Sequence, residues 1–499
     1  MHAVRSPRLS DALRAGRGAA GSLLGPLGCA LLAVAIYLPS LASSFQFDDW
    51  GVIVSDARVH SLAAWAGSMP GIRPLLKFTY ALNHELGGSP WEFRAFNIAV
   101  HALNTLLVFA LLYELSSKQG REPALARLSA LVATLLFALH PVQTEAVTYI
   151  SGRSTSLSAF FSLASLLVWA KTLDGLRPLP GRLLSAVLFA LALAVKETAI
   201  VLPLALLLWY AVARPIRPAT EDPPRALLGH SALLQIAPYM VIAIAGLIVA
   251  STWQPYRRLL EASLLVRSVA SNLLAQADAI FWLVGQLLCL APLNPDPVLG
   301  AQSGPDAATW LRATLVAAAI VAGFGQLRRR PALAFGTLWF FLWLLPTNSV
   351  LPRRDVVNDR QLYLAMIGPA WLAALALVRF PRSIDRPWER RRSIVLGVAL
   401  AALIGTTSAL TMRQNRIYAD EVTFWEAVVQ RSPASARAAD NLGFAYAMAC
   451  RPQDAARQFE RALRLDPNNV RARVNARLLE QGALPTEMAQ RDCPHPAPN

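Results

Sequence analysis

The sequence has little charge for its length. Only 16% of its 499 residues are Asp, Glu, Lys or Arg, whereas 55% are hydrophobic. Globular domains average about 25% charged residues, so this chain cannot cover a soluble surface with polar groups. The composition excludes a soluble globular protein and predicts a polytopic helical membrane protein of the all-α class.

Acidic residues are scarcer than basic ones. The chain has 31 Asp and Glu against 47 Lys and Arg, a formal net charge of +16. A strongly basic chain can indicate a nucleic-acid partner. Here, however, arginines cluster in short segments between apolar runs, such as 328–330 and 390–392, and no basic face is interleaved with aromatic residues. The excess of positive charge therefore indicates cytoplasmic loops and no nucleic-acid partner.

Cysteine is rare, with four residues and no CxxC or other metal-binding spacing. Cys29 and Cys289 lie in apolar runs, where a packing role is expected. Cys450 and Cys493 lie near the C-terminus and could form a disulfide if that region is extracytoplasmic. The alternative is that both remain free thiols.

Long apolar runs are abundant instead. They fall at about 22–41, 95–115, 128–142, 155–171, 183–195, 198–213, 232–253, 271–291, 309–327, 332–346, 362–380 and 393–412. Several are shorter than the roughly 20 residues that cross a bilayer unaided, so we expect tilt or local thinning. Arginines precede the first run and no cleavage site follows it, which predicts a cytoplasmic N-terminus over 1–21 and an uncleaved first span.

The basic loops conflict with a simple count of spans. Loops 214–230 and 326–331 should both be cytoplasmic, yet three apolar runs separate them, and a return to the same side needs an even number. Residues 251–291 carry several charges within this stretch. We therefore expect an amphipathic surface helix there, followed by a partial or re-entrant segment. The prediction is about 11 crossings, with about 13 as the alternative, and either places the C-terminus outside.

FQFDDW, residues 45–50, lies in the predicted long outer loop 42–94. It places two adjacent carboxylates, Asp48 and Asp49, between aromatic residues. Either could be the acid-base group of an enzyme, and the alternative is a cap and first-turn acid of a surface helix. Arg73 follows in the same loop, at an Arg-Pro step that disfavours helix.

Further polar clusters fall on the same predicted face. They comprise His140, Glu145 and Arg153; then Lys196 and Glu197; then Arg353, Arg354, Asp355, Asp359, Arg360 and Tyr363. A Lys-Glu pair at membrane depth is costly unless it is paired, whereas anchoring at the interface is the alternative for residues at span ends. Carboxylates can act as general bases, and guanidinium and ammonium groups bind phosphate. The combination predicts transfer from a polyprenyl-phosphate-linked donor to an extracytoplasmic acceptor.

Residues 436–469 follow a repeat pattern of roughly 34 residues. The matching positions are Leu442, Gly443, Tyr446, Ala455, Phe459, Ala462 and Pro467, and only the tryptophan position departs, at Ala439. The segment is identified as a tetratricopeptide repeat. We expect a membrane domain over 22–412, a repeat module over 413–486 with a capping helix after the repeat, and a disordered tail over 487–499. So short a module should pack against the membrane domain, because three or more repeats are usually needed for independent stability.

Together the motifs resemble the GT-C superfamily of membrane glycosyltransferases, in particular the TMTC O-mannosyltransferases with tetratricopeptide repeats and their bacterial relatives. FQFDDW is similar to the acidic motif of the first outer loop, HPVQTEAVTYISGR to a His-Pro…Gly-Arg motif, VKETAIVLP to a Lys-Glu motif, and DRQLYL to a Glu-Arg-x-Leu-Tyr-Leu-Pro signature. The departures from these motifs are Gln143, Thr155, Asp359 and Ala365.

The resemblance implies an inner-membrane, inverting enzyme that uses a polyprenyl-phospho-sugar lipid and a hydroxyl acceptor, with a periplasmic repeat module that contacts a protein or glycan acceptor. It implies Asp48 or Asp49 as general base and Arg153, Lys196 and Arg360 as ligands of the donor phosphate. Arg73, His140, Glu145, Glu197 and Tyr363 would support the pocket. No cofactor is required, and a divalent cation such as Mg²⁺ or Mn²⁺, if used, would be held by Asp48 and Asp49.

Two other functional classes are compatible with a polytopic protein of this kind. A non-catalytic membrane scaffold could recruit envelope proteins through the repeat module, and this is the alternative function. A transporter is disfavoured, because the charges gather near one face and no inverted repeat is evident.

Overall fold

The computed structural model describes residues 9–175, 178–213, 230–289, 292–299, 306–353, 355–378 and 387–482. Every regular element in these ranges is a helix, which confirms the predicted all-α class. The tail 487–499, with Cys493, lies outside the described residues, so its disorder and the possible bond to Cys450 stay predictions.

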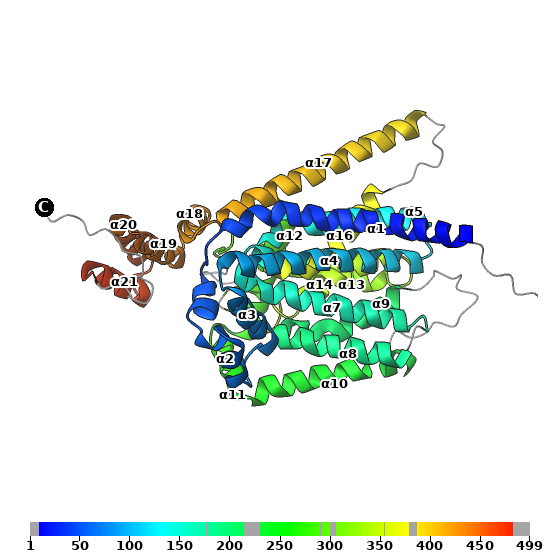
Figure 1. Ribbon diagram of the computed structural model, residues 1–499. Helices are drawn as coiled ribbons and strands as arrows, with labels where there is room; N and C mark the ends of the chain where they lie inside the picture. The colour runs from blue at the N-terminus through cyan, green and yellow to red at the C-terminus, as the bar shows by residue number, and fades with distance from the viewer. Residues whose placement is uncertain are drawn as a thin grey trace, which may run out of the picture.

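Apolar helices lie side by side in a bundle (Figure 1). Its members are α1 (Leu9–Tyr37), α4 (Pro90–Lys118), α5 (Pro123–Leu139), α7 (Arg153–Thr172), α8 (Pro178–Val195), α9 (Leu202–Val212), α10 (His230–Thr252), α13 (Ala307–Gly325), α14 (Pro331–Leu344) and α16 (Ile367–Leu377). Helix α17 (Pro387–Ile417) diverges from the bundle at an angle (Figure 1). By length and composition six of the described helices could cross a membrane, or eight if two bent helix pairs each form one span. The protein is therefore multi-pass. Length alone gives fewer spans than the predicted number of about 11, since shorter apolar helices such as α14 are not counted.

One end of the bundle carries the long connecting segments, and we call it the loop end. Here lie η1 (Leu38–Ala42), η2 (Trp50–Val54), η3 (Ala57–Val59), α2 (Leu62–Gly67), α3 (Pro74–Leu86), η4 (Pro141–Gln143), α6 (Thr144–Val147), η5 (Ile150–Gly152) and η6 (Glu197–Val201). Helix α3 begins directly after Arg73, whose backbone is left-handed (φ 52°), and ends before Gly87 (φ 148°). An Arg-Pro step disfavours helix at the arginine, and glycine tolerates a positive φ at the helix end. The predicted outer loop is thus a folded unit.

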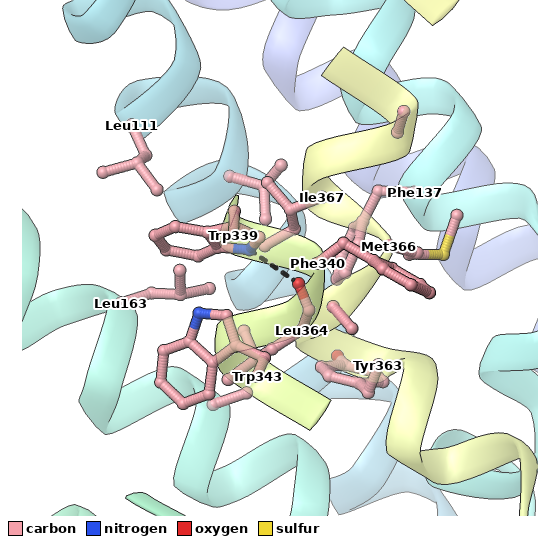
Figure 2. Packing of buried hydrophobic residues seen from close by; sticks show 14 of the residues in the cluster. Leu111, Phe137, Leu163, Trp339, Phe340, Trp343, Tyr363, Leu364, Met366 and Ile367 are labelled. Atoms are coloured by element: carbon pink, nitrogen blue, oxygen red, sulfur yellow. Dashed lines mark hydrogen bonds between the residues drawn. The ribbon is translucent and has the colours of Figure 1, made fainter. Parts of the chain in front are cut away.

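Close packing of α14 against α16 fixes the segment that precedes α16 (Figure 2). Trp339 on α14 donates its Nε1–H to the Leu364 carbonyl oxygen at 2.8 Å. Gly336 and Gly368 allow the two helices to touch, since a Cβ on Gly368 would lie 2.2 Å from the Gly336 carbonyl oxygen. The DRQLYL segment, which forms η7 (Asp359–Gln361) and most of α15 (Leu362–Ala365), is held by this contact.

Helices α11 (Gln254–Leu264) and α12 (Val269–Leu287) lie in the stretch between the basic loops 214–230 and 326–331, where the sequence has an odd number of apolar runs. The side chain of Asn272 donates to the Ser349 carbonyl oxygen (2.6 Å) after α14, and Asp278 pairs with Arg312 (2.6 Å) near the start of α13. The Leu287 carbonyl oxygen accepts from the His140 ring. These partners all lie towards the loop end, and α12 also packs beside α13. That this stretch contains a segment that does not simply cross stays a prediction.

The module that follows α17 stands at the loop end (Figure 1). It consists of α18 (Glu421–Arg431), α19 (Ala436–Met448), α20 (Pro452–Leu465) and α21 (Val470–Glu480). Helices α19 and α20 form the predicted repeat; Gly443 permits their crossing, because a Cβ there would lie 2.7 Å from the Phe459 ring. Trp425 on α18 shares one buried apolar cluster with Tyr149 of the membrane part. The module therefore packs against the membrane part, as expected.

Candidate functional site

The two carboxylates of the FQFDDW segment have different surroundings. Phe47 has a left-handed backbone (φ 47°) just before the acids, and Asp49 is fully buried whereas Asp48 is exposed. The Asp49 Oδ1 atom accepts hydrogen bonds from Ser151 N (2.9 Å) and Ser151 Oγ (2.5 Å), and its Oδ2 atom accepts from Gln46 N (3.2 Å). Asp49 thus ties this segment to the turn that precedes α7.

Burial raises the pKa of Asp49 to about 6, although the Ser151 hydrogen bonds and the Arg94 charge act in the opposite direction. Asp48 donates its backbone N–H to the Tyr149 hydroxyl (3.0 Å). Its charge acts on Arg360. Of the two acids, Asp48 is therefore the one whose carboxylate can reach a ligand from solvent.

An Asp49→Asn variant should lose a pH-dependent part of the stability. The folded-state pKa of Asp49, about 6, lies above the unfolded value of about 4, so the folded state holds the proton more tightly. The free energy of unfolding of the wild type should therefore fall by up to about 3 kcal/mol as pH rises from about 4 to about 6, and the variant should lack this decrease.

Thermal unfolding of the purified proteins in detergent, from pH 4 to pH 8, measures this difference. Asp174→Asn is the control, because Asp174 pairs with Lys118 near the other end of the bundle. Parallel pH profiles for the wild type and Asp49→Asn would contradict the assignment.

The repeat module holds the FQFDDW segment from a second side. Glu421, at the start of α18, accepts hydrogen bonds from Phe47 N (3.3 Å) and Trp50 Nε1 (3.0 Å). The Phe47 ring lies edge-on to the Trp425 ring, with 5.3 Å between centroids. Sequence reasoning missed Glu421, because its partner Trp50 lies 371 residues away in the chain.

Lys196, Arg353 and Arg360 line one small cavity of about 40 Å³, which we call the cationic cavity. Arg360 donates its backbone N–H to Glu145 Oε2 (2.9 Å), and its Nε lies 3.5 Å from Glu145 Oε1. Lys196 Nζ donates to Thr155 Oγ1 (2.6 Å). The structure thus brings together Lys196, Glu145 and Arg360 of the predicted site, and it adds Arg353, which the resemblance did not include.

The cationic cavity has more positive than negative charge. Glu145 compensates Arg360, whereas Lys196 and Arg353 form no ion pair within 4 Å in the described part of the chain. Thr155 stands where an acidic residue is usual in the resembling family, so Lys196 meets a hydroxyl there. Burial and the Arg360 charge lower the pKa of Arg353 to about 10. An anion such as phosphate would supply the missing negative charge.

Arg73 and Glu197 form a second charged pair nearby. The Arg73 Nη2 atom lies 2.8 Å from Glu197 Oε2, and its Nε lies 3.0 Å from Glu197 Oε1. The Tyr256 hydroxyl on α11 accepts from Arg73 N (3.3 Å). Glu197 is therefore neutralised by Arg73, and the adjacent Lys196 is left to the cationic cavity.

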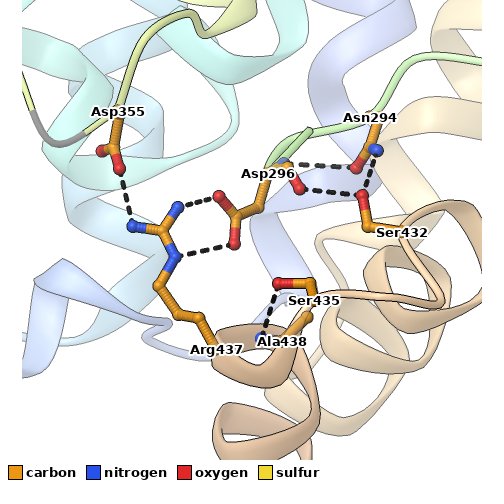
Figure 3. Close-up of polar contacts among 7 residues, drawn as sticks. All are labelled: Asn294, Asp296, Asp355, Ser432, Ser435, Arg437 and Ala438. Atoms are coloured by element: carbon orange, nitrogen blue, oxygen red, sulfur yellow. Dashed lines mark hydrogen bonds and ion pairs between the residues drawn. The ribbon is translucent and has the colours of Figure 1, made fainter. Parts of the chain in front are cut away.

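Arg437 in the repeat module connects two loops of the membrane part (Figure 3). Its Nη1 lies 2.6 Å from Asp355 Oδ1 and its Nε lies 3.0 Å from Asp296 Oδ2. Nearby, Asn294 Nδ2 donates to Ser432 Oγ (2.8 Å). The start of α19 therefore holds the loop that leads from α14 into η7, and the turn before it holds the loop after α12.

A second small cavity, of about 30 Å³, lies between the repeat module and the membrane part, and we call it the seam cavity. Glu145, Asn358 and Arg360 line it from the membrane part, and Trp425 and Arg437 line it from the module. Arg360 lines both cavities. The seam cavity and the cationic cavity therefore meet at the DRQLYL segment.

Arg153, which was predicted to bind the donor phosphate, lines neither cavity. Its fully buried guanidinium donates to Asn97 Oδ1 (2.8 Å), the Thr79 carbonyl oxygen (3.1 Å) and the Phe93 carbonyl oxygen (2.9 Å). Its Cζ lies 4.4 Å from the centroid of the Phe96 ring. Because its N–H groups are hydrogen-bonded within the protein, Arg153 joins α3 and α4 to the start of α7.

His140 and Tyr363 also line neither cavity, although both were predicted to support the pocket. A His140 ring nitrogen lies 3.0 Å from the Leu287 carbonyl oxygen. The Tyr363 hydroxyl is buried between His101 Nδ1 (2.8 Å) and Asn104 Nδ2 (2.9 Å), and its ring belongs to the core in Figure 2. Both residues position helices around the site.

In the part of the chain that the structure describes, the acidic residues do not form a metal-binding cluster. In the described ranges no three His, Cys, Asp or Glu residues come close enough together to hold a metal ion. The oxygens of Asp49 already accept hydrogen bonds from Ser151 and Gln46. These residues therefore do not fit the divalent cation that Asp48 and Asp49 would hold, and no step of the reaction is assigned to a metal.

A much larger apolar cavity of about 680 Å³ lies between α9, α12, α13 and α14. Its walls are mainly aliphatic and aromatic, with Leu208 and Phe341 among them. At the loop end it reaches Asn348, and the adjacent Thr347 lines the cationic cavity. A large apolar cavity and a cluster of positive charges thus lie on neighbouring residues of one segment, an arrangement that fits a lipid with a phosphate head group.

Comparison with known proteins identifies relatives of both parts of the chain. The family model "Tetratricopeptide repeat" matches residues 436–469. The protein O-mannosyl-transferase Tmtc1 of Drosophila melanogaster is 31% identical over 195 residues, which are 36% of this chain and 22% of the relative. Human TMTC2 is 30% identical over 165 residues (30% and 19%), and human TMTC4 is 35% identical over 139 residues (26% and 17%). The matches therefore span about a fifth of each relative's length.

Two solved structures from Archaeoglobus fulgidus also align with this chain. The apo oligosaccharyltransferase has a TM-score of 0.44 and 12% identity, and the alignment covers 79% of this chain and 56% of that one. The oligosaccharyltransferase AglB in complex with an inhibitory peptide and a dolichol-phosphate has a TM-score of 0.44 and 14% identity, with coverage of 81% and 57%. Over the matched residues the chain is similar to the TMTC protein O-mannosyl-transferases, and it carries a tetratricopeptide repeat at 436–469.

Proposed function

We propose that this protein transfers a sugar from a polyprenyl-phospho-sugar lipid to a hydroxyl group, with inversion at the anomeric carbon. The observation that carries the proposal is that two adjacent residues, Asn348 and Thr347, line the apolar cavity and the cationic cavity respectively. The loop end would face the extracytoplasmic side of the inner membrane, as the basic loops predict.

The donor half of the reaction follows from the two cavities. The polyprenyl chain would lie in the apolar cavity, and its phosphate would lie beside Lys196, Arg353 and Arg360. Positive groups placed at the phosphate stabilise the charge that develops as the bond to the sugar breaks. The phosphate leaves with both electrons of that bond, and polyprenyl phosphate is the lipid product.

The acceptor half needs a base near the anomeric carbon. Asp48 is exposed and lines neither small cavity, but its backbone N–H donates to the Tyr149 hydroxyl, and Tyr149 and the adjacent Phe47 line the seam cavity. As Asp48 takes the proton of the acceptor hydroxyl, the acceptor oxygen bonds to the anomeric carbon. Asp49 would hold Asp48 in place through Ser151. The names of the relatives favour a protein hydroxyl as acceptor, and the repeat module would contact that protein.

An Asp48→Asn variant should lower sugar transfer about 100-fold or more, the usual contribution of a general base, while the protein still folds. Asp49→Asn should have a smaller effect, about tenfold, because it removes only a positioning contact. The assay uses purified protein in detergent, radiolabelled undecaprenyl-phospho-mannose, and a periplasmic extract as the source of acceptor.

Asp174→Asn, the same chemical change near the other end of the bundle, should transfer sugar at the wild-type rate. Wild-type transfer by both Asp48→Asn and Asp49→Asn would overturn the assigned role. A non-catalytic scaffold would show no transfer with any of these proteins, the wild type included.

A further inference from the structure

Two buried amides beside the cationic cavity lack the partners that such groups normally have. Asn358 is 3% exposed and Gln361 is 8% exposed. Neither the nitrogen nor the oxygen of either side-chain amide has a hydrogen-bond partner among the described residues. A buried polar group without a partner is costly, so these amides are expected to bond to something that enters the site.

The complete lack of partners distinguishes these two amides. Within the described ranges, Asn358 and Gln361 are the only amides whose nitrogen and oxygen are both buried and both without a hydrogen-bond partner. Asn97 shows the ordinary case: its Nδ2 donates to the Val147 and Ile150 carbonyl oxygens (3.2 and 3.3 Å), and its Oδ1 accepts from Arg153. A purely structural role would have left Asn358 bonded in the same way.

The position of these amides indicates which part of a ligand they would meet. Asn358 lines both the cationic cavity and the seam cavity, and Gln361 lines the cationic cavity. They flank Arg360 in the chain. The phosphate of a lipid donor would lie on one side of Asn358, and Asp48 follows Phe47, which lines the seam cavity on the other side. The group between the phosphate and the base is the sugar.

We propose that Asn358, with Gln361 beside it, binds hydroxyl groups of the transferred sugar. An amide offers two N–H donors and one acceptor oxygen, which match neighbouring sugar hydroxyls that both donate and accept. The amides are neutral, so they select for the sugar without changing the attraction between the cations and the phosphate. This inference rests on the proposed function, since it requires a sugar linked to a lipid phosphate.

The test compares two lipids that differ only in the sugar: undecaprenyl phosphate and undecaprenyl-phospho-mannose. Their dissociation constants are measured with the purified full-length protein in detergent. Asn358→Ala should bind undecaprenyl-phospho-mannose about tenfold more weakly than the wild type does, because hydrogen bonds to the sugar are lost. It should bind undecaprenyl phosphate within about twofold of the wild type. Gln361→Ala should show the same pattern with a smaller effect.

Asn468→Ala, at an exposed amide of the repeat module, is the matched control and should bind both lipids like the wild type. The wild type should prefer the lipid that carries the sugar. Equal weakening of both lipids in Asn358→Ala, or no weakening of either, would overturn the sugar subsite and leave the proposed function intact. A wild type that binds neither lipid would overturn both.

Discussion

Replacing Arg360 by alanine should lower sugar transfer by about 100- to 1,000-fold, the cost of losing one positioned group that stabilises developing charge. Arg360 is the cation that lines both the cationic cavity and the seam cavity. Its backbone and guanidinium both meet Glu145. Lys196 and Arg353 line only the cationic cavity, and Arg437 lines only the seam cavity and is paired with Asp296 and Asp355, so none of them can replace Arg360.

The loss should come from chemistry and not from unfolding, and the variants can separate the two. Arg360→Ala leaves Glu145 as an uncompensated buried carboxylate, which costs about 3–5 kcal/mol of stability. The double variant Glu145→Gln with Arg360→Met removes both charges, so it should recover stability in thermal unfolding and still transfer no sugar. Arg312→Ala, which removes another ion-paired arginine, is the control. Transfer by folded Arg360→Ala at more than about a tenth of the wild-type rate would contradict the assignment.

Replacing Arg153 by alanine should mainly lower the stability of the fold, whereas replacing Arg360 should mainly lower sugar transfer. The substitution leaves the acceptors at Asn97, Thr79 and Phe93 buried and unpaired. Breaking a buried charged network of this kind costs about 3–5 kcal/mol or more, against a total stability of about 5–15 kcal/mol for a typical domain. We expect little monodisperse protein after extraction and a large fall in the unfolding temperature.

Arg153→Lys should not rescue the fold, because an ammonium group cannot present the planar fork that reaches these separate acceptors. The measurements are yield, size-exclusion profile and thermal unfolding of Arg153→Ala and Arg153→Lys beside the wild type. A well-folded Arg153→Ala protein that selectively fails to bind undecaprenyl phosphate would contradict the structural role and restore the phosphate role.

Much of the fold could be predicted, because hydrophobic burial and topology leave strong local patterns. The scarcity of charge indicated the helical membrane part, and the spacing of small and aromatic residues from Leu442 to Pro467 indicated the repeat. The odd number of apolar runs between two basic loops drew attention to 251–291, where the structure has the two helices α11 and α12. Span lengths were less predictable, since bends and short helices depend on tertiary contacts such as that of Gly336 with Gly368.

The site was only partly predictable, because charge type does not show what a side chain contacts. Arg153 and Arg360 both stand in motif-like segments, yet the acceptors around Arg153 come from α3 and α4, 56 to 74 residues earlier in the chain. Asp48 and Asp49 are neighbours with equal local signals, and only packing against Ser151 distinguishes them. Asn358 carries no charge at all.

The hydrogen bonds from Phe47 and Trp50 to Glu421 also have a consequence for the order in which the site is made. Glu421 lies 374 residues after Phe47, so the ribosome has synthesised the whole bundle before the acceptor of these two bonds emerges. Domains generally fold from the N-terminus as synthesis proceeds, but this segment must wait for α18. The folded conformation of the FQFDDW segment is thus linked to synthesis of α18, and a nascent chain that has not reached Glu421 lacks the contact that completes it.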